Sequence, residues 1–160
     1  MRDIGKSHGN SAFAANARHA RGTCSLRYTD IVAGSARHLA GADLDLLILG
    51  DDIAMQTGMM MSLDMWREVF KPRLMHVIRA AREVKPDIHV FYHSDGNVWD
   101  AIPDLIEAGV DVLNPVQPEC MDPAEVKKEF GDRLSFFGTI SVQKTMLFGT
   151  PDDVRAEVKL

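Results

Sequence analysis

The feature that most restricts the fold of this 160-residue chain is a repeated alternation of short apolar runs with helix-like segments. Each apolar run ends in polar residues or glycine, and a segment with helical spacing or helix-capping residues follows it. The runs are LLIL (46–49), IHVFY (88–92), VDVL (110–113) and RLSFF (133–137). Strands that alternate with helices through short loops are typical of a parallel α/β sheet. We therefore predict four parallel strands in about four β/α units.

The segments between the runs carry helix start and stop signals. The longest helix is expected between Ser62, a plausible N-cap, and Pro86, which closes the segment. Pro72 lies inside it and lacks a backbone donor, so it predicts a kink or a restart at that point. Residues 31–42 can form a short helix, and further helices are expected over residues 98–109, 122–131 and 150–160.

The first thirty residues show neither a helical nor a strand period. We expect residues 1–30 to be an unpatterned leader, disordered or foreign to the fold, and residues 31–160 to form the domain. The leader lacks the apolar core of a secretory signal.

Composition excludes several classes of protein. The net charge of −5 argues against a general nucleic-acid binder. No apolar run approaches the roughly 18 residues of a membrane span, so no membrane association is expected. Two distant cysteines, Cys24 and Cys120, do not form a disulfide framework, and a cytoplasmic location is the expectation.

Polar residues gather where the predicted strands end. Parallel α/β folds collect functional groups at the carboxyl ends of their strands, so these residues are expected to form one rim of a site. His93 and Asp95 lie two positions apart and therefore share a face in extended backbone. They suit a metal such as zinc, or a base with its orienting partner. The alternative is that Asp95 caps the next helix or anchors the turn, while His93 hydrogen-bonds inside the fold.

Carboxylates and amides extend this candidate site. Asp51 and Asp52 follow the first strand, and adjacent positions point to opposite faces, so only one is expected to face the site. Asp52 joins His93 and Asp95 as a predicted catalytic residue; the alternative for the aspartate pair is a solvated turn. The predicted substrate-binding residues are Asp51, Asn114, Gln117 and Gln143.

Several stretches together resemble the uroporphyrinogen decarboxylase superfamily. They are "LILGDDIAMQTGMMMS", "FYHSDG", "LIEAGVDVLNPVQPECMDPAEVKKEFGDRLSFFGTISVQ" and "LFGTPDDVRAEV". The resemblance implies a (β/α)8 barrel with its site at the carboxyl ends of the strands. It is closer to the methyltransferase-like branch, whose enzymes move methyl groups between methylated corrinoid proteins and thiols such as coenzyme M.

The chain departs from both branches of that family. In the thiol methyltransferases a His-x-Cys pair and a distant cysteine hold zinc. His93 matches the histidine, but Asp95 stands where the cysteine would be, which makes a harder and less thiophilic site. Residues 1–30 match none of the early arginine and aspartate residues of the decarboxylases. Asp52 is then the best candidate for a carboxylate that contacts substrate.

Length leads to a further expectation. A full barrel needs roughly 250 residues, whereas this chain supplies four strands, so we expect a partial barrel and a fragment. Such a fragment would expose two strand edges and could pair with a copy of itself through them.

The resemblance implies two enzymatic functions, and the incomplete barrel adds a third, non-catalytic one. The first is methyl transfer by the parent enzyme, with a corrinoid carrier or corrinoid protein and a small-molecule substrate. The second is metal-free decarboxylation of a porphyrinogen in tetrapyrrole biosynthesis. The third is a non-catalytic remnant or binding module.

Overall fold

The computed structural model describes residues 26–159, and the greater part of the expected leader, residues 1–25, lies outside the described range. Its centre is a parallel sheet in the order β1-β4-β5-β6. The strands are β1 (Leu46–Gly50), β4 (His89–His93), β5 (Val112–Asn114) and β6 (Ser135–Phe136). The prediction of four parallel strands that alternate with helices is confirmed.

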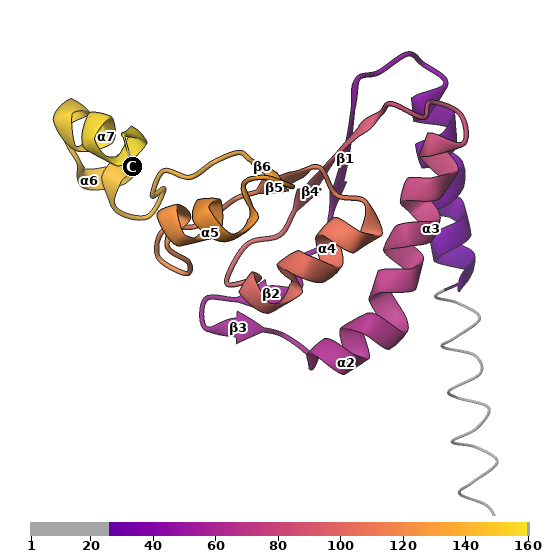
Figure 1. The fold of residues 1–160 in the computed structure, drawn as a ribbon, viewed down its shortest axis with the longest axis horizontal. Helices are drawn as coiled ribbons and strands as arrows, with labels where there is room; N and C mark the ends of the chain where they lie inside the picture. The colour runs from indigo at the N-terminus through magenta and orange to yellow at the C-terminus, as the bar shows by residue number, and fades with distance from the viewer. Residues whose placement is uncertain (1–25, 160) are drawn as a thin grey trace, which may run out of the picture.

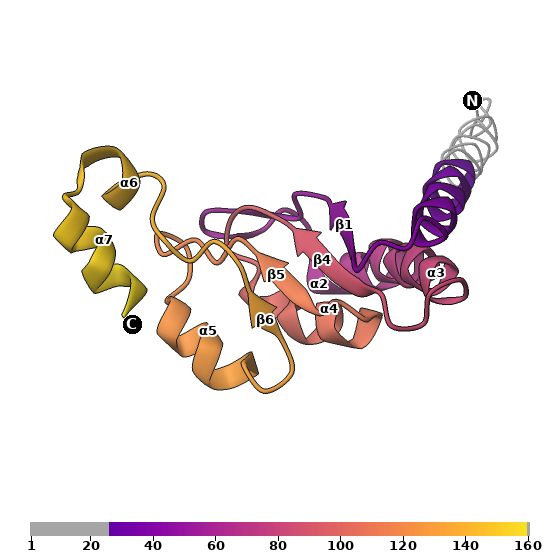
Figure 2. The same ribbon diagram turned by 90° about the horizontal axis from the view of Figure 1, so that it is seen from above.

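Helices cover one face of this sheet (Figures 1 and 2). They are α3 (Lys71–Arg82), α4 (Ile102–Ala108) and α5 (Pro123–Phe130). Val90 and Leu113, from the middle of β4 and β5, are fully buried beneath them, together with Ile102 and Leu105 of α4. Asp122 caps α5 through a hydrogen bond from the Ala124 amide, as its position before Pro123 predicts.

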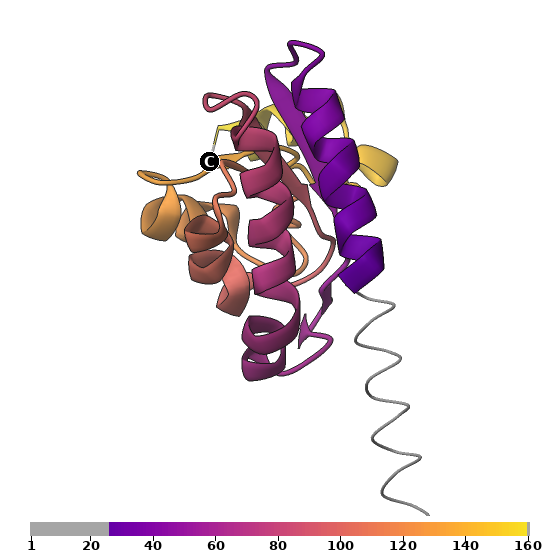
Figure 3. The ribbon, with the colours of Figure 1, turned by 90° about the vertical axis from the view of Figure 1, so that its right-hand side faces the viewer.

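Residues 26–40 form a helix that crosses the boundary expected at residue 30. This helix lies beside α3 (Figure 3). Its buried positions are Thr29, Ala33, Ala36 and Ala40, and the three alanines share a core cluster with Val77 of α3. Because small side chains occupy the buried stripe, the apolar period that marks an amphipathic helix is weak in the sequence.

The long segment that contains Pro72 is divided, as predicted. It begins with α2 (Leu63–Met65), continues as a π-helical turn, η1 (Trp66–Phe70), and regains α-helical geometry in α3. Ser62 caps α2 by accepting a hydrogen bond from the Met65 amide at 3.2 Å. Pro72 falls in the first turn of α3, directly after the π-helical turn, where a residue without an amide hydrogen interrupts the α-helical hydrogen-bond ladder.

Smaller elements complete the chain. A short hairpin of β2 (Ala54–Met55) and β3 (Gly58–Met59) follows β1, and a 3-10 turn, η2 (Trp99–Ala101), precedes α4. The last helices, α6 (Thr145–Phe148) and α7 (Pro151–Val158), lie at the far end of the molecule (Figure 1). Within residues 26–159, no helix combines the length and apolarity needed to cross a membrane.

The other face of the sheet is open within the described part of the chain. Ile48 alternates with the inward-packed Leu47 and Leu49 and is 65% exposed. Phe137, which follows β6, is 64% exposed and touches Phe91 of β4 edge-on. His93 shares this open face with Phe91, so the predicted site residues lie on the face that the helices leave uncovered.

A buried carboxylate joins the long helical segment to α4. Asp104 is 3% exposed and accepts hydrogen bonds from Arg67 Nε at 2.8 Å and Lys71 Nζ at 2.5 Å. Burial alone would raise the pKa of the Asp104 carboxyl, but the bonds from Lys71 and Arg67 hold that pKa below its ordinary value.

This lowered pKa predicts an acid-dependent loss of stability. Because Asp104 is deprotonated more readily in the folded chain, its stabilisation is present above about pH 3.9 and is lost as pH falls through the folded-state pKa. Urea unfolding between about pH 5 and pH 2 should show the advantage of wild type over Asp104→Asn shrinking towards acid. The exposed Asp100→Asn is the control; an advantage of wild type over Asp104→Asn that did not change with pH would contradict the assignment.

Candidate functional site

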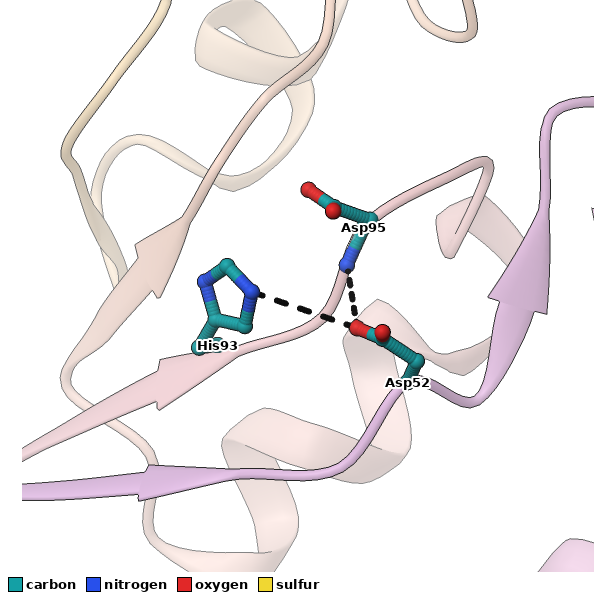
Figure 4. Close-up of side chains that lie close together, drawn as sticks. All are labelled: Asp52, His93 and Asp95. Atoms are coloured by element: carbon teal, nitrogen blue, oxygen red, sulfur yellow. Dashed lines mark hydrogen bonds and ion pairs between the residues drawn. The ribbon is translucent and has the colours of Figure 1, made fainter.

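Asp52, His93 and Asp95 come together at the carboxyl ends of β1 and β4 (Figure 4). Each offers a potential ligand atom, and these atoms lie within 4.8 Å of one another. His93 Nε2 is 3.9 Å from Asp52 Oδ1. All three residues were predicted as site residues, and we refer to them as the Asp-His-Asp cluster.

The register of the sheet explains why these residues meet. Gly50, the last residue of β1, pairs with His93, the last residue of β4, and the Asp51 amide extends the ladder to the His93 carbonyl at 3.1 Å. The chain after β1 then carries Asp52 towards the loop after β4. There Asp52 Oδ1 accepts a hydrogen bond from the Asp95 amide at 3.0 Å, which fixes the orientation of the carboxylate.

Asn114 orients the His93 ring. The two residues are register partners at the ends of β4 and β5, and His93 Nδ1 lies 2.7 Å from Asn114 Oδ1. Asn114 Nδ2 donates to the Phe137 carbonyl at 2.9 Å, so the amide oxygen is the atom that faces the ring. Nδ1 must therefore carry the proton in the neutral ring, and Nε2 presents its lone pair beside Asp52.

Two buried polar residues hold the loop behind the cluster. Ser94 is fully buried; its Oγ accepts from the Ile53 amide at 3.1 Å and donates to the Asp95 carbonyl at 3.2 Å. Gln117 is 8% exposed and accepts from the Gly96 amide at 2.7 Å. Ser94 thus joins the loop that carries Asp52 to the loop that carries Asp95. It was not among the predicted site residues, because its role depends on contacts between distant segments.

Replacing Ser94 by alanine tests this link. Ser94→Ala leaves the buried Ile53 amide without its acceptor, which we expect to lower the free energy of unfolding by about 1–3 kcal/mol. Guanidinium unfolding followed by tryptophan fluorescence measures the change. Ser35→Ala, which removes an exposed hydroxyl that donates to Ile31 O, should change stability by less than about 0.5 kcal/mol. Equal effects of the two substitutions would show that the link contributes nothing.

The donor set of the Asp-His-Asp cluster fits a divalent metal ion. One imidazole nitrogen and two carboxylates supply three protein ligands, the number that catalytic zinc sites use. Two ligands of one zinc ion lie at most about 4.2 Å apart, since each bond is about 2.1 Å, and His93 and Asp52 already meet this limit at 3.9 Å. Nitrogen with two carboxylate oxygens makes a harder set than one containing thiolates.

Asp51 faces away from the cluster. It lines a cavity next to Trp66 and Tyr92, on the side of β1 that the helices cover. Burial raises the pKa of the Asp51 carboxyl, and the neighbouring charge of Asp52 adds to the increase. Asp51 and Asp52 thus point to different places, which agrees with the expectation that only one of the pair faces the site.

The remaining predicted residues have different surroundings. Asn114 forms a hydrogen bond with the His93 ring, and Gln117 accepts one from the Gly96 amide. The part of both residues in substrate binding stays a prediction. Gln143 is exposed in the loop before α6, and the described contacts do not bring it to the cluster.

A parallel set of β/α units with polar side chains at the strand carboxyl ends is typical of α/β proteins that bind ligands at that edge, the (β/α)8 barrels among them. The chain belongs to the uroporphyrinogen decarboxylase (URO-D) family, whose model matches residues 19–160. This confirms the resemblance found in the sequence.

Two methyltransferases are among the proteins that this chain resembles. It is 29% identical over 132 residues to Methylcobamide:CoM methyltransferase MtaA of Methanosarcina barkeri, covering 82% of this chain and 37% of that protein. A solved structure of a methyltransferase from Methanosarcina mazei superposes with a TM-score of 0.66 at 24% identity, covering 82% of this chain and 36% of the other. The structural likeness confirms the partial barrel. The chain spans little more than a third of the length of either protein.

Proposed function

We propose that this chain carries part of the active site of a methyltransferase that works with a corrinoid carrier, and that Asp52, His93 and Asp95 bind a divalent metal ion in it. The observation that carries the proposal is the convergence of one imidazole and two carboxylates at the strand ends of a URO-D family chain. The relative named as a methylcobamide:CoM methyltransferase supports methyl transfer as the reaction. A cation bound there would lower the pKa of a methyl acceptor and stabilise its anion.

The residues of the cluster have separate roles in this proposal. His93 offers the Nε2 lone pair, because Asn114 keeps the proton on Nδ1. Asp52 and Asp95 supply two negative charges that attract a cation and leave positions open for an acceptor. Asp52 is held ready by the Asp95 amide, so little side-chain freedom is lost on binding.

A spectroscopic experiment tests whether a thiol methyl acceptor binds the metal ion of the cluster. The chain is loaded with Co²⁺ as a visible substitute for zinc and titrated with coenzyme M, the thiol in the name of the curated relative. We expect a saturable thiolate-to-cobalt charge-transfer band, because the cluster leaves ligand positions open. The band should be absent in His93→Ala and present in His76→Ala, which removes a histidine on α3 outside the cluster.

Two other results would support the alternative functions. Tight binding of a polycarboxylated porphyrin without metal, unchanged in His93→Ala, would favour decarboxylation, with Asp52 as the substrate contact. Neither thiol nor porphyrin binding would favour the non-catalytic remnant. Pairing of two copies through the edges of β1 and β6 stays a prediction for light scattering to test, and the cytoplasmic location also stays a prediction.

A further inference from the structure

The parallel sheet has two free edges in the described part of the chain. β1 and β6 stand at the two ends of the strand order β1-β4-β5-β6. The Asp51 amide donates to the His93 carbonyl, so the alternation along a parallel strand turns the amide and carbonyl of Ile48 away from β4. On β6 the Phe137 amide donates to β5, which turns the backbone of Phe136 outward in the same way. Each edge can therefore accept one more strand.

The open face of the sheet has no cover among the described residues. Ile48 and Phe137 are exposed on it, and Leu46 shares the face with Ile48. In a closed barrel of eight parallel strands this face is the interior, because eight strands enclose a space that their own side chains fill. The described residues supply four strands, so two copies of the chain supply the eight that closure requires.

Exposed apolar side chains mark the helix that flanks β1. The helix of residues 26–40 packs against Leu47 of β1 through its buried alanines. Tyr28, Ile31 and Leu39 lie on one side of this helix, outside the buried stripe, and all three are exposed. An exposed apolar surface of this kind indicates a contact with another molecule.

The segment that follows β6 carries a second apolar surface. α6 and α7 lie beyond β6, at the opposite end of the molecule from the helix of residues 26–40 (Figures 1 and 2). Met146, Leu147 and Phe148 of α6 are exposed, as is Val158 of α7, and neither helix has a buried residue. The two ends of the described chain thus both present apolar helix surfaces, each beside a free strand edge.

The two surfaces carry opposite charges. Arg27 and Arg37 outnumber the single acidic residue of the helix of residues 26–40. Asp152, Asp153 and Glu157 outnumber the single basic residue of α7. Contact between the two surfaces is therefore favourable, whereas pairing each surface with its own copy would bring charges of one sign together. This complementarity favours a second copy of the chain, docked head to tail, as the molecule that covers both.

We propose that two copies of this chain close one eight-stranded parallel barrel, with β1 of each copy paired to β6 of the other. The two open faces form the interior of this barrel. α6 and α7 of each copy pack against the helix of residues 26–40 of its partner. A two-fold axis along the barrel relates the copies, so the same junction of β6 with β1 occurs twice and no strand edge remains free.

Closure of the barrel completes the surroundings of the Asp-His-Asp cluster. All strands of a parallel barrel end at one rim, so the clusters of both copies lie at the same mouth. A substrate at one cluster is then enclosed by the strand ends of the other copy, and the site is incomplete in a single copy. The pairing itself does not depend on the metal binding proposed for the cluster.

Sedimentation equilibrium of the chain and of two proline variants tests the pairing. Ile48→Pro removes the outward amide of β1 and Phe136→Pro removes that of β6, so each should raise the dimer dissociation constant by about ten-fold or more. Pairing of β1 with β1 would respond to Ile48→Pro alone, and pairing of β6 with β6 to Phe136→Pro alone. His93→Ala should form the dimer as wild type does, which separates this proposal from the metal site. A monomeric wild type, or a dimer that only one proline variant weakens, overturns the proposal.

Energy transfer between copies needs no change at either strand edge and stays decisive if a proline variant does not fold. Cys24 and Cys120 are replaced by serine, and dyes are attached at Ala42→Cys, after the first helix, or at Lys159→Cys, after α7. Donor chains labelled at 42 are mixed with acceptor chains labelled at 159 or at 42. We expect more efficient transfer in the first mixture, because the junction brings these two positions together while the two-fold axis places both copies of position 42 across the barrel. Equal or more efficient transfer in the second mixture contradicts the head-to-tail arrangement.

Discussion

Gly96→Ala should strongly destabilise the folded chain. Gly96 has a φ of +89°, which side chains rarely adopt, and an added Cβ would lie 2.6 Å from the Met55 carbonyl oxygen and 2.8 Å from its carbon. Both contacts are with backbone, so no flexible side chain can move aside. We expect a loss of about 3 kcal/mol or more in the free energy of unfolding.

Gly34→Ala is the matched control for this prediction. Gly34 lies in the helix of residues 26–40, and an added Cβ there would meet nothing within 4 Å. Alanine favours a helix over glycine by about 0.5–1 kcal/mol, so this variant should be stabilised. Urea unfolding of both variants measures the contrast. A Gly96→Ala chain as stable as wild type would show that the close approach to the β2–β3 hairpin is not maintained in solution.

Asn114→Leu should weaken metal binding at the Asp-His-Asp cluster by about 10- to 100-fold, the usual effect of removing a partner that orients a ligating histidine. Leucine has a similar volume but neither accepts a hydrogen bond from His93 Nδ1 nor donates one to Phe137 O. The His93 ring is then no longer held in one tautomer and one orientation. Zinc competition against a chromophoric chelator measures the affinity.

Two variants distinguish this role from a general loss of structure. Asn114→Asp keeps an acceptor for Nδ1–H and should retain most of the affinity. Gln143→Leu makes the same amide-to-apolar change at an exposed position and should leave zinc binding unaltered. If Asn114→Leu bound zinc as tightly as Gln143→Leu, Asn114 would not be a positioning residue for His93.

The sequence predicted the sheet because each strand is a short apolar run with a polar end, a signal that needs no knowledge of neighbours. It missed residues 26–30 of the first helix because their one buried position, Thr29, is polar and gives no apolar signal. The β2–β3 hairpin was also missed, since two-residue strands carry no measurable alternation.

In the candidate site, too, the sequence predicted what depends on local spacing and missed contacts between distant segments. His93 and Asp95 were identified because a two-residue spacing places both on one face of a strand. The contact between His93 and Asn114 depends on the register of β4 against β5, and the contact between Asp52 and Asp95 depends on two separate loops. Neither contact can be predicted from spacing along the chain. The residues could therefore be predicted from the sequence, but not the partners that each of them contacts.

Zinc titration by calorimetry tests whether the Asp-His-Asp cluster binds a metal ion. His93→Ala removes the only nitrogen ligand, and His89→Ala removes the histidine at the opposite end of the same strand. We expect wild type and His89→Ala to bind one zinc ion per chain with equal affinity, and His93→Ala to bind more than about 100-fold more weakly. Indistinguishable titrations of His93→Ala and His89→Ala would show that the cluster does not bind the metal ion.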